Sequence, residues 1–308
     1  IRAMGSAPDA NVVITDECHH DGALNRKTIC DSYGPNIIVV GFTASPERGD
    51  GVSLGEGGAG YQRILTPITI AELQALWHAS NGREGLVPIH TYSTPTLKPR
   101  TKADGWCEDP LLMYQRLCSG SQMVAFWDTV EQSEREAARF NAAGISSVSV
   151  KGGVDRTVEL ARFDAREFKV IHNVGCLTEG WDSYVETVGV FCGVSFFGAW
   201  LQRIGRGARP AKGKTHCTVL DPFGHIFKGW SVDIPRAWTL DGTPSRPVEY
   251  CPPLQQCKRC GCVAAPGKAC VRCGEPMAEY IGPKARKELA RRGSRDSATP
   301  RENVRRLG

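Results

Sequence analysis

The sequence predicts an α/β protein with two doubly wound parallel-sheet domains, the first of them incomplete, and a small cysteine-rich module after the second. Short β-branched runs typical of buried strands alternate with helical patterns, as they do in parallel sheets covered on both faces. The alternation occurs in two series, separated by residues 95–105, which are rich in Pro, Lys and Thr. Two closely spaced cysteine pairs follow the second series.

The first series contains too few strands for a whole domain. It predicts buried strands at residues 12–14 and 37–40, a helix at 70–77, and at 87–92 a strand that leaves the domain. We therefore assign residues 1–95 to the C-terminal part of a domain that is either small or lacks its beginning. A linker is expected at residues 96–118.

The second series is complete, because its strands suffice for a doubly wound sheet. Strands are predicted at residues 123–127, 147–150, 170–171, 188–191 and 217–220, and helices at about 130–143, 156–163 and 199–207. This domain is expected at residues 119–248, the cysteine-rich module at 249–280 and a tail at 281–308.

Composition argues against a wholly disordered chain and against a membrane-spanning one. The 308 residues are 41% hydrophobic and 23% charged, which allows two ordinary cores. No apolar run reaches the length of a membrane-spanning helix, and residues 1–9 lack the features of a signal peptide. We therefore expect a soluble, cytoplasmic protein without a membrane partner.

The positive charge of the chain belongs to its tail. The formal net charge is +5, and residues 284–308 alone contain nine Lys or Arg against three Asp or Glu. A basic tail of this kind is either solvated or in contact with a phosphate backbone. A nucleic acid is the partner that this charge pattern favours.

Paired carboxylates, Asp16 and Glu17, stand directly after the first predicted strand. Open α/β sheets bind ligands at the carboxyl ends of their strands. The pair suits hydrolysis of a nucleoside triphosphate, in which one carboxylate orders Mg²⁺ and the other orients and deprotonates the attacking water. Acidic pairs beside histidines are also common on protein surfaces, so the pair alone does not decide the function.

Four segments, in order, resemble motifs II, III, V and VI of superfamily 2 helicases. They are Asp16-Glu17-Cys18-His19-His20, Gly41-Phe42-Thr43-Ala44-Ser45-Pro46-Glu47-Arg48, Thr178-Glu179-Gly180-Trp181-Asp182 and Gln202-Arg203-Ile204-Gly205-Arg206-Gly207-Ala208-Arg209-Pro210. Singly, the second could be a turn and the fourth a solvated basic helix face, but their order argues against chance. The resemblance covers roughly residues 11–222 and is closest to DEAD/DEAH-box-like helicases related to XPB and to restriction-enzyme motors, mostly bacterial and phage proteins.

The resemblance implies two RecA-like domains with ATP between them and DNA, or RNA, running across both, in a bacterial or phage-infected cell. In the first domain, Asp16 would hold Mg²⁺, Glu17 would be the general base, and His20 would couple the site to the second domain. Thr43 and Ser45 would link the carboxylates to movement between the domains.

In the second domain, Arg206 and Arg209 would stabilise charge on the γ-phosphate. They are three residues apart, so on a helix that ends at Pro210 they would project from the same face. Gln202 and Asp182 would support nucleotide and interdomain contacts. Thr178, with its neighbours Glu179 and Gly180, would lie near the nucleic-acid backbone. Gly205 and Gly207 are poor helix formers, which indicates close approach of backbone or ligand.

One departure from the family is serious. The chain has no Gly-x-x-x-x-Gly-Lys-Ser/Thr sequence, which in the family precedes the acidic pair, and the glycine-rich residues 55–60 lack the Lys-Ser/Thr. Without that backbone cradle and its lysine, the β- and γ-phosphates lose their main anchor. We expect the chain alone to hydrolyse ATP poorly, and we expect a missing N-terminal segment or a second subunit to supply the loop. A degenerate motor is the alternative.

The cysteine-rich module has the spacing of a zinc ribbon. Cys257 and Cys260 form one Cys-x-x-Cys pair and Cys270 and Cys273 another, with nine residues between the pairs and a glycine after each. Four thiolates at this spacing complete a tetrahedral Zn²⁺ site, and the short polar loop between them has no core of its own. Free thiols are the less favoured interpretation.

The sequence thus predicts an ATP-dependent helicase or translocase that uses ATP, Mg²⁺ and Zn²⁺. Two alternatives remain open: a non-catalytic nucleic-acid-binding adaptor on the same scaffold, and the motor subunit of a restriction system. The carboxylates and arginines argue against the adaptor, because a binding module has no use for a general base.

Overall fold

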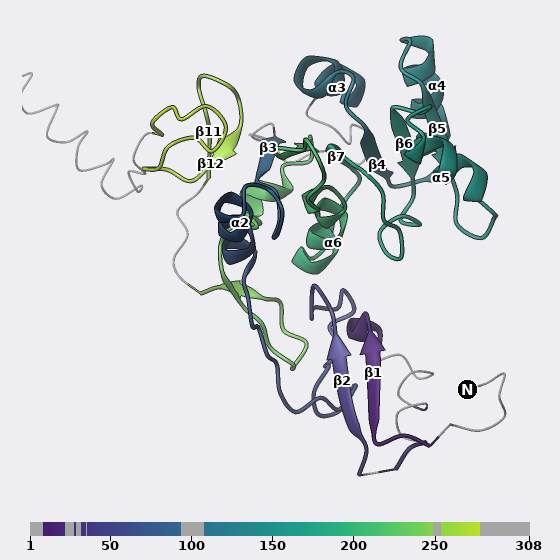
Figure 1. The fold of residues 1–308 in the computed structure, drawn as a ribbon, viewed down its shortest axis with the longest axis vertical. Coiled ribbons are helices and arrows are strands. Elements are labelled where there is room, and N and C mark those ends of the chain that lie inside the picture. The colour runs from purple at the N-terminus through teal and green to yellow at the C-terminus, as the bar shows by residue number, and fades with distance from the viewer. Residues whose placement is uncertain are drawn as a thin grey trace, which may run out of the picture.

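The computed structural model describes residues 9–21, 28, 32–34, 36–93, 108–248 and 254–277. The predicted basic tail and the first part of the predicted linker lie outside these ranges. The described chain forms a large parallel sheet with helices on both faces, a two-stranded sheet beside it, and the small cysteine-rich module (Figure 1). None of the described helices has the length and apolar character needed to cross a membrane.

The smaller sheet contains β1 (Val12–Asp16) and β2 (Ile38–Phe42), which run parallel with Val12 opposite Ile38 and Asp16 opposite Phe42. The short 3-10 helix η1 (Cys18–His20) follows β1. Side chains along both strands alternate between exposed and half-buried. The exposed set includes Ile14 and Phe42, which are 68% and 58% exposed. This sheet therefore presents an apolar face to solvent.

The larger sheet has six strands, all of them parallel. From one edge to the other they are β3 (Ile89–Ser93), β8 (Cys217–Asp221), β7 (Thr187–Phe191), β4 (Met123–Trp127), β6 (Val170–Asn173) and β5 (Ser147–Val150). Parallel strands covered on both faces are apolar throughout rather than alternating. In β4 every residue is buried: Val124 and Phe126 face one core, and Met123, Ala125 and Trp127 face the other.

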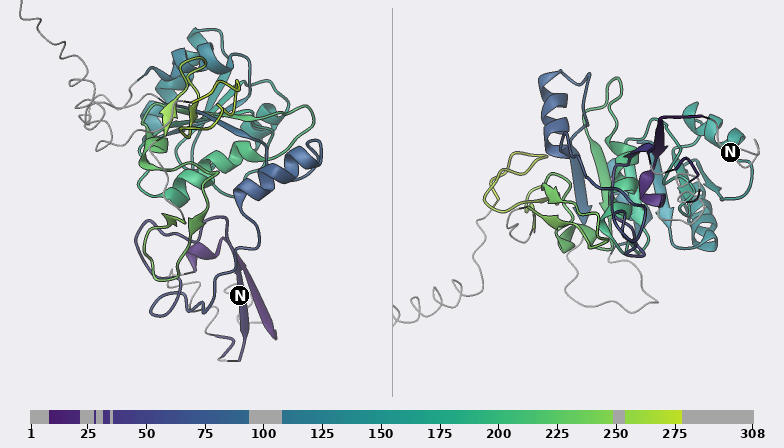
Figure 2. Two further views of the ribbon diagram at one scale, coloured as in Figure 1. Left: turned by 90° about the vertical axis from the view of Figure 1, so that its left-hand side faces the viewer. Right: turned by 90° about the horizontal axis from the view of Figure 1, so that it is seen from below.

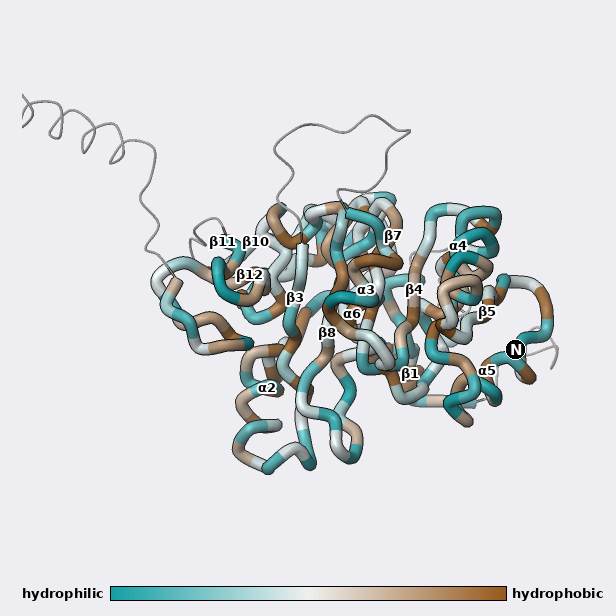
Figure 3. Tube along the Cα trace, turned by 90° about the horizontal axis from the view of Figure 1, so that it is seen from above, coloured by the Kyte–Doolittle hydropathy of each residue, from teal (hydrophilic) through white to brown (hydrophobic). Residues whose placement is uncertain are grey.

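Helices cover both faces of this sheet. The first core is closed by α2 (Ile70–Ala79), α5 (Thr157–Asp164) and α6 (Phe197–Ala208), and the second by α3 (Pro110–Cys118) and α4 (Val130–Ala142). Apolar residues gather along the strands and hydrophilic ones on α4 (Figure 3). Helix α6 lies between the six-stranded sheet and the two-stranded one (Figures 1 and 2).

The remaining elements are short and lie near the end of the described chain. They are the 3-10 helix η2 (His225–Lys228), the antiparallel pair β9 (Arg236–Ala237) and β10 (Arg246–Pro247), and the antiparallel pair β11 (Gln255–Gln256) and β12 (Val263–Ala264) of the cysteine-rich module. The loop between β9 and β10 contacts the segment that follows the smaller sheet. The carbonyl oxygen of Leu240 accepts hydrogen bonds from the N–H groups of Leu54 and Gly55 at 2.8 and 2.9 Å.

The strand predicted to leave the first domain instead belongs to the larger sheet. Strand β3 pairs with β8, with Ile89 opposite Cys217 and Ser93 opposite Asp221, and so forms the edge of the six-stranded sheet. The boundary at residue 95 therefore falls after a strand of the second unit, not before it. The apolar pattern identified the strand correctly, but a strand's pattern does not say which sheet it joins.

A helix occupies the C-terminal half of the segment predicted to be a linker. Helix α3 begins at Pro110, and the Asp109 carboxylate caps it by accepting hydrogen bonds from the N–H groups of Leu111 and Leu112. Proline is favoured at the first position of a helix, and Asp at the N-cap. Met113 and Tyr114 are buried in the second core. Residues 110–118 are thus part of the fold, and the prediction of a linker there is wrong.

Helix α6 packs closely on the sheet through a glycine. A Cβ atom at Gly207 would lie 2.3 Å from Sγ of Cys217 and 2.8 Å from Cγ2 of Val188, so no larger residue fits without displacement. A Cβ atom at Gly205 would meet no heavy atom within 4 Å. The close approach predicted for the two glycines therefore exists at Gly207, where it is to the sheet, while Gly205 faces open space.

We expect Gly207→Ala to lower the free energy of unfolding by about 1–3 kcal/mol, because the added methyl group overpacks the contact between α6 and the sheet. Gly205→Ala is the matched control: it should leave that free energy unchanged or raise it by up to about 1 kcal/mol, since alanine favours the helix. Urea unfolding followed by circular dichroism measures both. Equal losses in the two variants would contradict the packing described for α6.

Candidate active site at the junction of the two sheets

The end of β1 carries the predicted carboxylates to the junction of the two sheets. Asp16 is the last residue of β1, and Glu17 has left-handed backbone angles (φ 51°, ψ 49°) that turn the chain into η1. The thiol of the buried Cys18 packs against Gly41 of β2, where a Cβ atom would lie 2.6 Å from Cβ of Cys18. Glycine at position 41 therefore lets η1 close down on the sheet.

His19 is the central residue of the junction. Its Nδ1 lies 2.9 Å from Oγ1 of Thr43 and 3.3 Å from Oε2 of Glu17. Its Nε2 lies 3.3 Å from Oε1 of Glu179 and 3.1 Å from Nε2 of Gln202. The buried imidazole thus joins β1 and β2 of the smaller sheet to α6 and to the loop after β6 of the larger one.

The sequence predicts His20 as the coupling residue and gives no role to His19. His20 does reach the other sheet, since its Nε2 lies 3.1 and 3.0 Å from the two carboxylate oxygens of Glu179, but its side chain is about half exposed. His19, unlike His20, also contacts Thr43 and Gln202. The signal that could have found it was its place as the fourth residue of Asp-Glu-Cys-His.

The segment after β2 contacts His19 through hydrogen bonds. The Thr43 hydroxyl donates to the carbonyl oxygen of Ser45 at 3.2 Å, and the Ser45 N–H donates back to Oγ1 of Thr43 at 3.1 Å. Ser45 is buried against Gly198 in the first turn of α6. Arg48, which the sequence analysis did not select, donates from Nη1 to the carbonyl oxygen of His19 at 2.7 Å. Thr43 therefore contacts His19, and Ser45 contacts α6.

The two predicted arginines converge, but not for the reason predicted. Helix α6 ends at Ala208, and Arg209 already has extended backbone angles (φ −66°, ψ 137°). The two guanidinium groups meet because Nη1 of each donates to the carbonyl oxygen of Trp181, from Arg209 at 3.3 Å. Arg209 also forms an ion pair with Asp182. The loop after β6, rather than a shared helix face, brings the arginines together.

Burial and neighbouring charges shift the pKa values of the groups at the junction in different directions. Burial, together with the nearby charges of Glu179 and Asp16, raises the pKa of Glu17, and the charge of Arg206 opposes this rise. Burial would raise the pKa of Glu179, but hydrogen bonds and charge from His20 and His19 outweigh it, so that this pKa is lowered. Burial lowers the pKa of His19. A carboxylate with a raised pKa accepts a proton more readily than an ordinary one.

The residues predicted to lie near nucleic acid occupy the loop after β6. The carboxylate of Glu179 points to His19 and His20, so that this residue contacts the smaller sheet. Gly180 has a positive φ of 64°, which favours glycine. The hydroxyl of Thr178 is buried, with no hydrogen-bond partner among the described residues.

The four predicted cysteine ligands come together. Sγ of Cys257 lies 3.7 Å from Sγ of Cys273, Sγ of Cys260 lies 3.6 Å from Sγ of Cys270, and all four are within 4.8 Å of one another. Tetrahedral Zn²⁺ with Zn–S bonds of about 2.3 Å separates its sulfur atoms by about 3.8 Å. The thiols therefore fit a zinc ion, and Gly261 and Gly274 after each pair have the positive φ angles that the turns require.

The cysteine-rich module packs on the edge strand β3. Cys262, which is not part of the four-cysteine cluster, is fully buried and forms a β-bridge with Tyr92. The guanidinium of Arg272 lies 5.2 Å from the ring centroid of Tyr92, and Nε2 of Gln256 donates to the carbonyl oxygen of Ser93. The module therefore covers part of the edge of the larger sheet. Cys251 lies outside the described residues.

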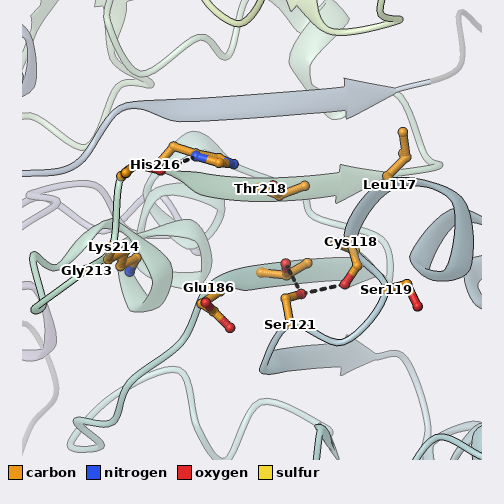
Figure 4. Close-up of a pocket in the computed structure, with 11 residues that line it drawn as sticks. Leu117, Cys118, Ser119, Ser121, Glu186, Gly213, Lys214, His216 and Thr218 are labelled. Carbon is orange, nitrogen blue, oxygen red and sulfur yellow. Dashed lines mark hydrogen bonds between the residues drawn. The ribbon is translucent and has the colours of Figure 1, made fainter.

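A cavity of about 190 Å³ lies at the opposite end of the strands from the junction (Figure 4). Glu186, Lys214 and His216 are among the residues that line it, and Ser121 and Thr187 share a hydrogen bond of 2.8 Å at its floor. The cavity includes none of the residues predicted for the site. It adjoins the C-terminus of α6 through Lys214.

Lys214 holds the C-terminus of α6. Its buried ammonium donates to the carbonyl oxygens of Gly207 and Arg209 at 2.5 and 2.9 Å. The last carbonyl groups of a helix have no partner within the helix, so a cation here satisfies them and interacts favourably with the helix dipole. Lys214 thereby fixes the backbone at Arg209.

Lys214→Met should lower the free energy of unfolding by about 1–3 kcal/mol, because buried carbonyl groups lose their donor. Lys212→Met removes an exposed lysine two residues away and should change that free energy by less than about 0.5 kcal/mol. Thermal and urea unfolding compare the two variants. If Lys214→Met were as stable as Lys212→Met, the ammonium would not hold the end of α6.

Comparison with known proteins supports the fold. No family model matches the chain. It is 27% identical over 200 residues to a 51.5 kDa protein of Lactococcus phage (isolate 7-9), a match that covers 59% of this chain and 42% of the phage protein. It is similar to the structure of a fragment assigned to the HsdR subunit of a type I restriction enzyme from Vibrio vulnificus YJ016, with a TM-score of 0.52 and 17% identity.

The chain spans less than half the length of either protein, since the structural match covers 76% of this chain and 46% of the Vibrio fragment. At 17% identity, the similarity to the Vibrio fragment shows a shared fold. The six-stranded parallel sheet with helices on both faces confirms the predicted α/β class with a doubly wound parallel sheet.

Proposed function

We propose that the chain is the part of an ATP-dependent superfamily 2 helicase or translocase that carries motifs II, III, V and VI, and that it acts on DNA, with RNA as the alternative track. One observation carries this proposal: side chains from the four segments that resemble motifs II, III, V and VI meet at one point. They are Glu17 and His19, Thr43, Glu179, and Gln202 with Arg206.

The chemistry of these groups suits hydrolysis of ATP between two lobes. Asp16 would hold Mg²⁺, which neutralises charge on the phosphates, and Glu17 would orient and deprotonate water. The raised pKa of Glu17 favours this role, because a stronger base accepts the proton of water more readily. Arg206 and Arg209 come from the other lobe, where positive charge stabilises the γ-phosphate in the transition state.

The exposed apolar face of β1 and β2 supports the expected source of the missing phosphate-binding loop. A two-stranded sheet is marginal in water by itself, and large exposed apolar patches mark contact surfaces. Ile14, Ile38 and Phe42 are each more than half exposed. Further strands of a RecA-like domain, from an upstream segment or from a second subunit, would cover these residues and bring the loop to the end of the sheet.

The comparisons bear on the kind of system in which the motor works. The fold likeness to a restriction-enzyme fragment favours the motor subunit of a restriction system over an isolated helicase, and the phage relative agrees with a bacterial or phage-infected cytoplasm. A non-catalytic adaptor is disfavoured, because it has no use for arginines and carboxylates that meet at the junction.

The test of the motor is nucleic-acid-stimulated ATPase activity of this chain beside a form that includes the upstream part of its own gene. We expect turnover from the longer form alone. In that form Glu17→Gln should reduce turnover by about 10²-fold or more while ATP binding remains, because the general base is lost.

Glu56→Gln, at an exposed carboxylate of the same unit, is the matched control and should leave turnover unchanged. Undiminished hydrolysis by Glu17→Gln would refute the role assigned to that residue. If neither form hydrolysed ATP but both bound nucleic acid, the adaptor would replace the motor.

We also propose that the four-cysteine cluster binds structural Zn²⁺ and that the ribbon belongs to the second lobe. Cys257, Cys270 and the neighbouring Cys262 lie in the same apolar core as Tyr92 and Met113. Loss of the ion would therefore expose part of that core as well as unfold the ribbon.

Metal analysis of the purified chain should find about one zinc per molecule in the ribbon. Cys273→Ser should abolish this zinc and lower the Tm, since it removes a ligand, whereas Cys176→Ser, at a half-buried thiol outside the cluster, should retain the metal. Retention of zinc by Cys273→Ser would contradict the proposed ligand set.

A further inference from the structure

A second group of metal-ligating side chains lies at the junction of the two sheets. Nε2 of His19, Nε2 of His20 and the carboxylate of Glu179 each offer one ligand atom, and these atoms lie within 4.8 Å of one another. The histidines belong to η1, after β1, and Glu179 belongs to the loop after β6. The two sheets therefore contribute to one potential site.

We propose that His19, His20 and Glu179 bind a divalent transition-metal ion, of which Zn²⁺, Co²⁺ and Ni²⁺ are the candidates, and that the ion links the two sheets. Imidazole and carboxylate ligands suit these ions, and three protein ligands leave a position for water. The site differs in chemistry from the four-cysteine cluster, which offers sulfur ligands alone. It also differs from a Mg²⁺ site, because Mg²⁺ prefers oxygen ligands.

The contacts of Nδ1 suit the tautomer of His19 that a metal requires. A Thr43 hydroxyl that donates to the carbonyl oxygen of Ser45 leaves its own oxygen to accept from Nδ1 of His19. Oε2 of Glu17, 3.3 Å from Nδ1, is also an acceptor. With the imidazole proton on Nδ1, the lone pair of Nε2 faces Glu179 and the Gln202 amide. Metal-bound histidines typically make such a bond from their other nitrogen.

The surroundings of Nε2 favour a cation at this point. Nε2 of His19 lies 3.3 Å from an oxygen of Glu179 and 3.1 Å from Nε2 of Gln202. With the ring proton on Nδ1, the Gln202 amide donates to Nε2, and the Glu179 oxygen faces it as a second acceptor. An ion that displaces the amide contact forms coordinate bonds to both Nε2 and Glu179. Glu17 and Asp16 add negative charge nearby, whereas Arg206 opposes them. The net charge of these groups is negative, which attracts a divalent ion.

The site is open to solvent on one side. The His20 side chain is 48% exposed and that of Glu179 is 33% exposed, whereas His19 is 8% exposed. An ion can therefore enter without unfolding the junction, exchange with added metal, and take its water ligand from solvent. Because its ligands come from both sheets, the bound ion holds them together and opposes any opening of the junction.

The test is metal binding by the 308-residue chain without a histidine tag, which would compete for the same ions. Co²⁺ is the probe, since thiolate ligands give intense charge-transfer absorption and nitrogen or oxygen ligands do not. One molar equivalent of Zn²⁺ is added first, which the four thiolates take up, and the chain is then titrated with Co²⁺ by calorimetry and absorbance. We expect about one further equivalent, with weak d–d bands and no thiolate absorption.

Two ligand variants and one control decide the location. His20→Ala and Glu179→Gln should each weaken Co²⁺ binding by about tenfold or more. His78→Ala removes an exposed histidine of α2 outside the site and should leave the affinity unchanged. Bound Co²⁺ should also slow amide hydrogen exchange in both η1 and residues 177–182 of the wild type, because it links them.

Three results would overturn the proposal: no Co²⁺ bound beyond the cysteine cluster, thiolate absorption from the further ion, or a further ion that His20→Ala and Glu179→Gln bind as tightly as the wild type. Each of these measurements is independent of ATPase activity. The outcome therefore stands apart from that of the proposed motor function.

Discussion

The buried imidazole of His19 is the contact on which the arrangement of the two sheets depends. A buried polar ring is costly unless both nitrogens have partners, and here those partners come from different segments: Thr43 and Glu17 at Nδ1, and Glu179 and Gln202 at Nε2. The partners at Nδ1 belong to the same unit as His19, whereas those at Nε2 belong to the unit of the larger sheet. With the ring proton on Nδ1, the group that satisfies Nε2 is the Gln202 amide, so the requirement for satisfied hydrogen bonds places η1 opposite α6.

The packing of each sheet holds these partners in position before they meet. On the smaller sheet, the absence of a side chain at Gly41 allows Cys18, and with it η1, to pack closely on β2. On the larger sheet, Gly207 sets the distance of α6 from β7 and β8, and Lys214 fixes the end of that helix. The position of Arg206 at the junction thus follows from contacts on the far side of α6, away from any ligand.

The sequence predicted what depends on local pattern. Apolar runs predicted the strands and helices of residues 123–221. The conformational limits of proline predicted that α6 ends before Pro210. The spacing of the cysteines predicted the sulfur cluster. Partner choice was not predictable, because it depends on the whole fold. The apolar run at β3 fits either sheet, and the letters Asp-Glu-Cys-His-His do not show that Glu179 contacts both histidines.

The two sheets differ in how much of their surface other elements cover, and this difference determines how the smaller sheet is held in position. Exposed edges and apolar faces of sheets invite association. The edge of the larger sheet at β3 is covered in part by the cysteine-rich module, which makes a β-bridge from Cys262 to Tyr92. The smaller sheet has no such cover over Ile14 and Phe42 among the described residues. Its position relative to the larger sheet therefore rests on the junction around His19 and on the loop at Leu240, and any group that occupies the junction acts directly on that position.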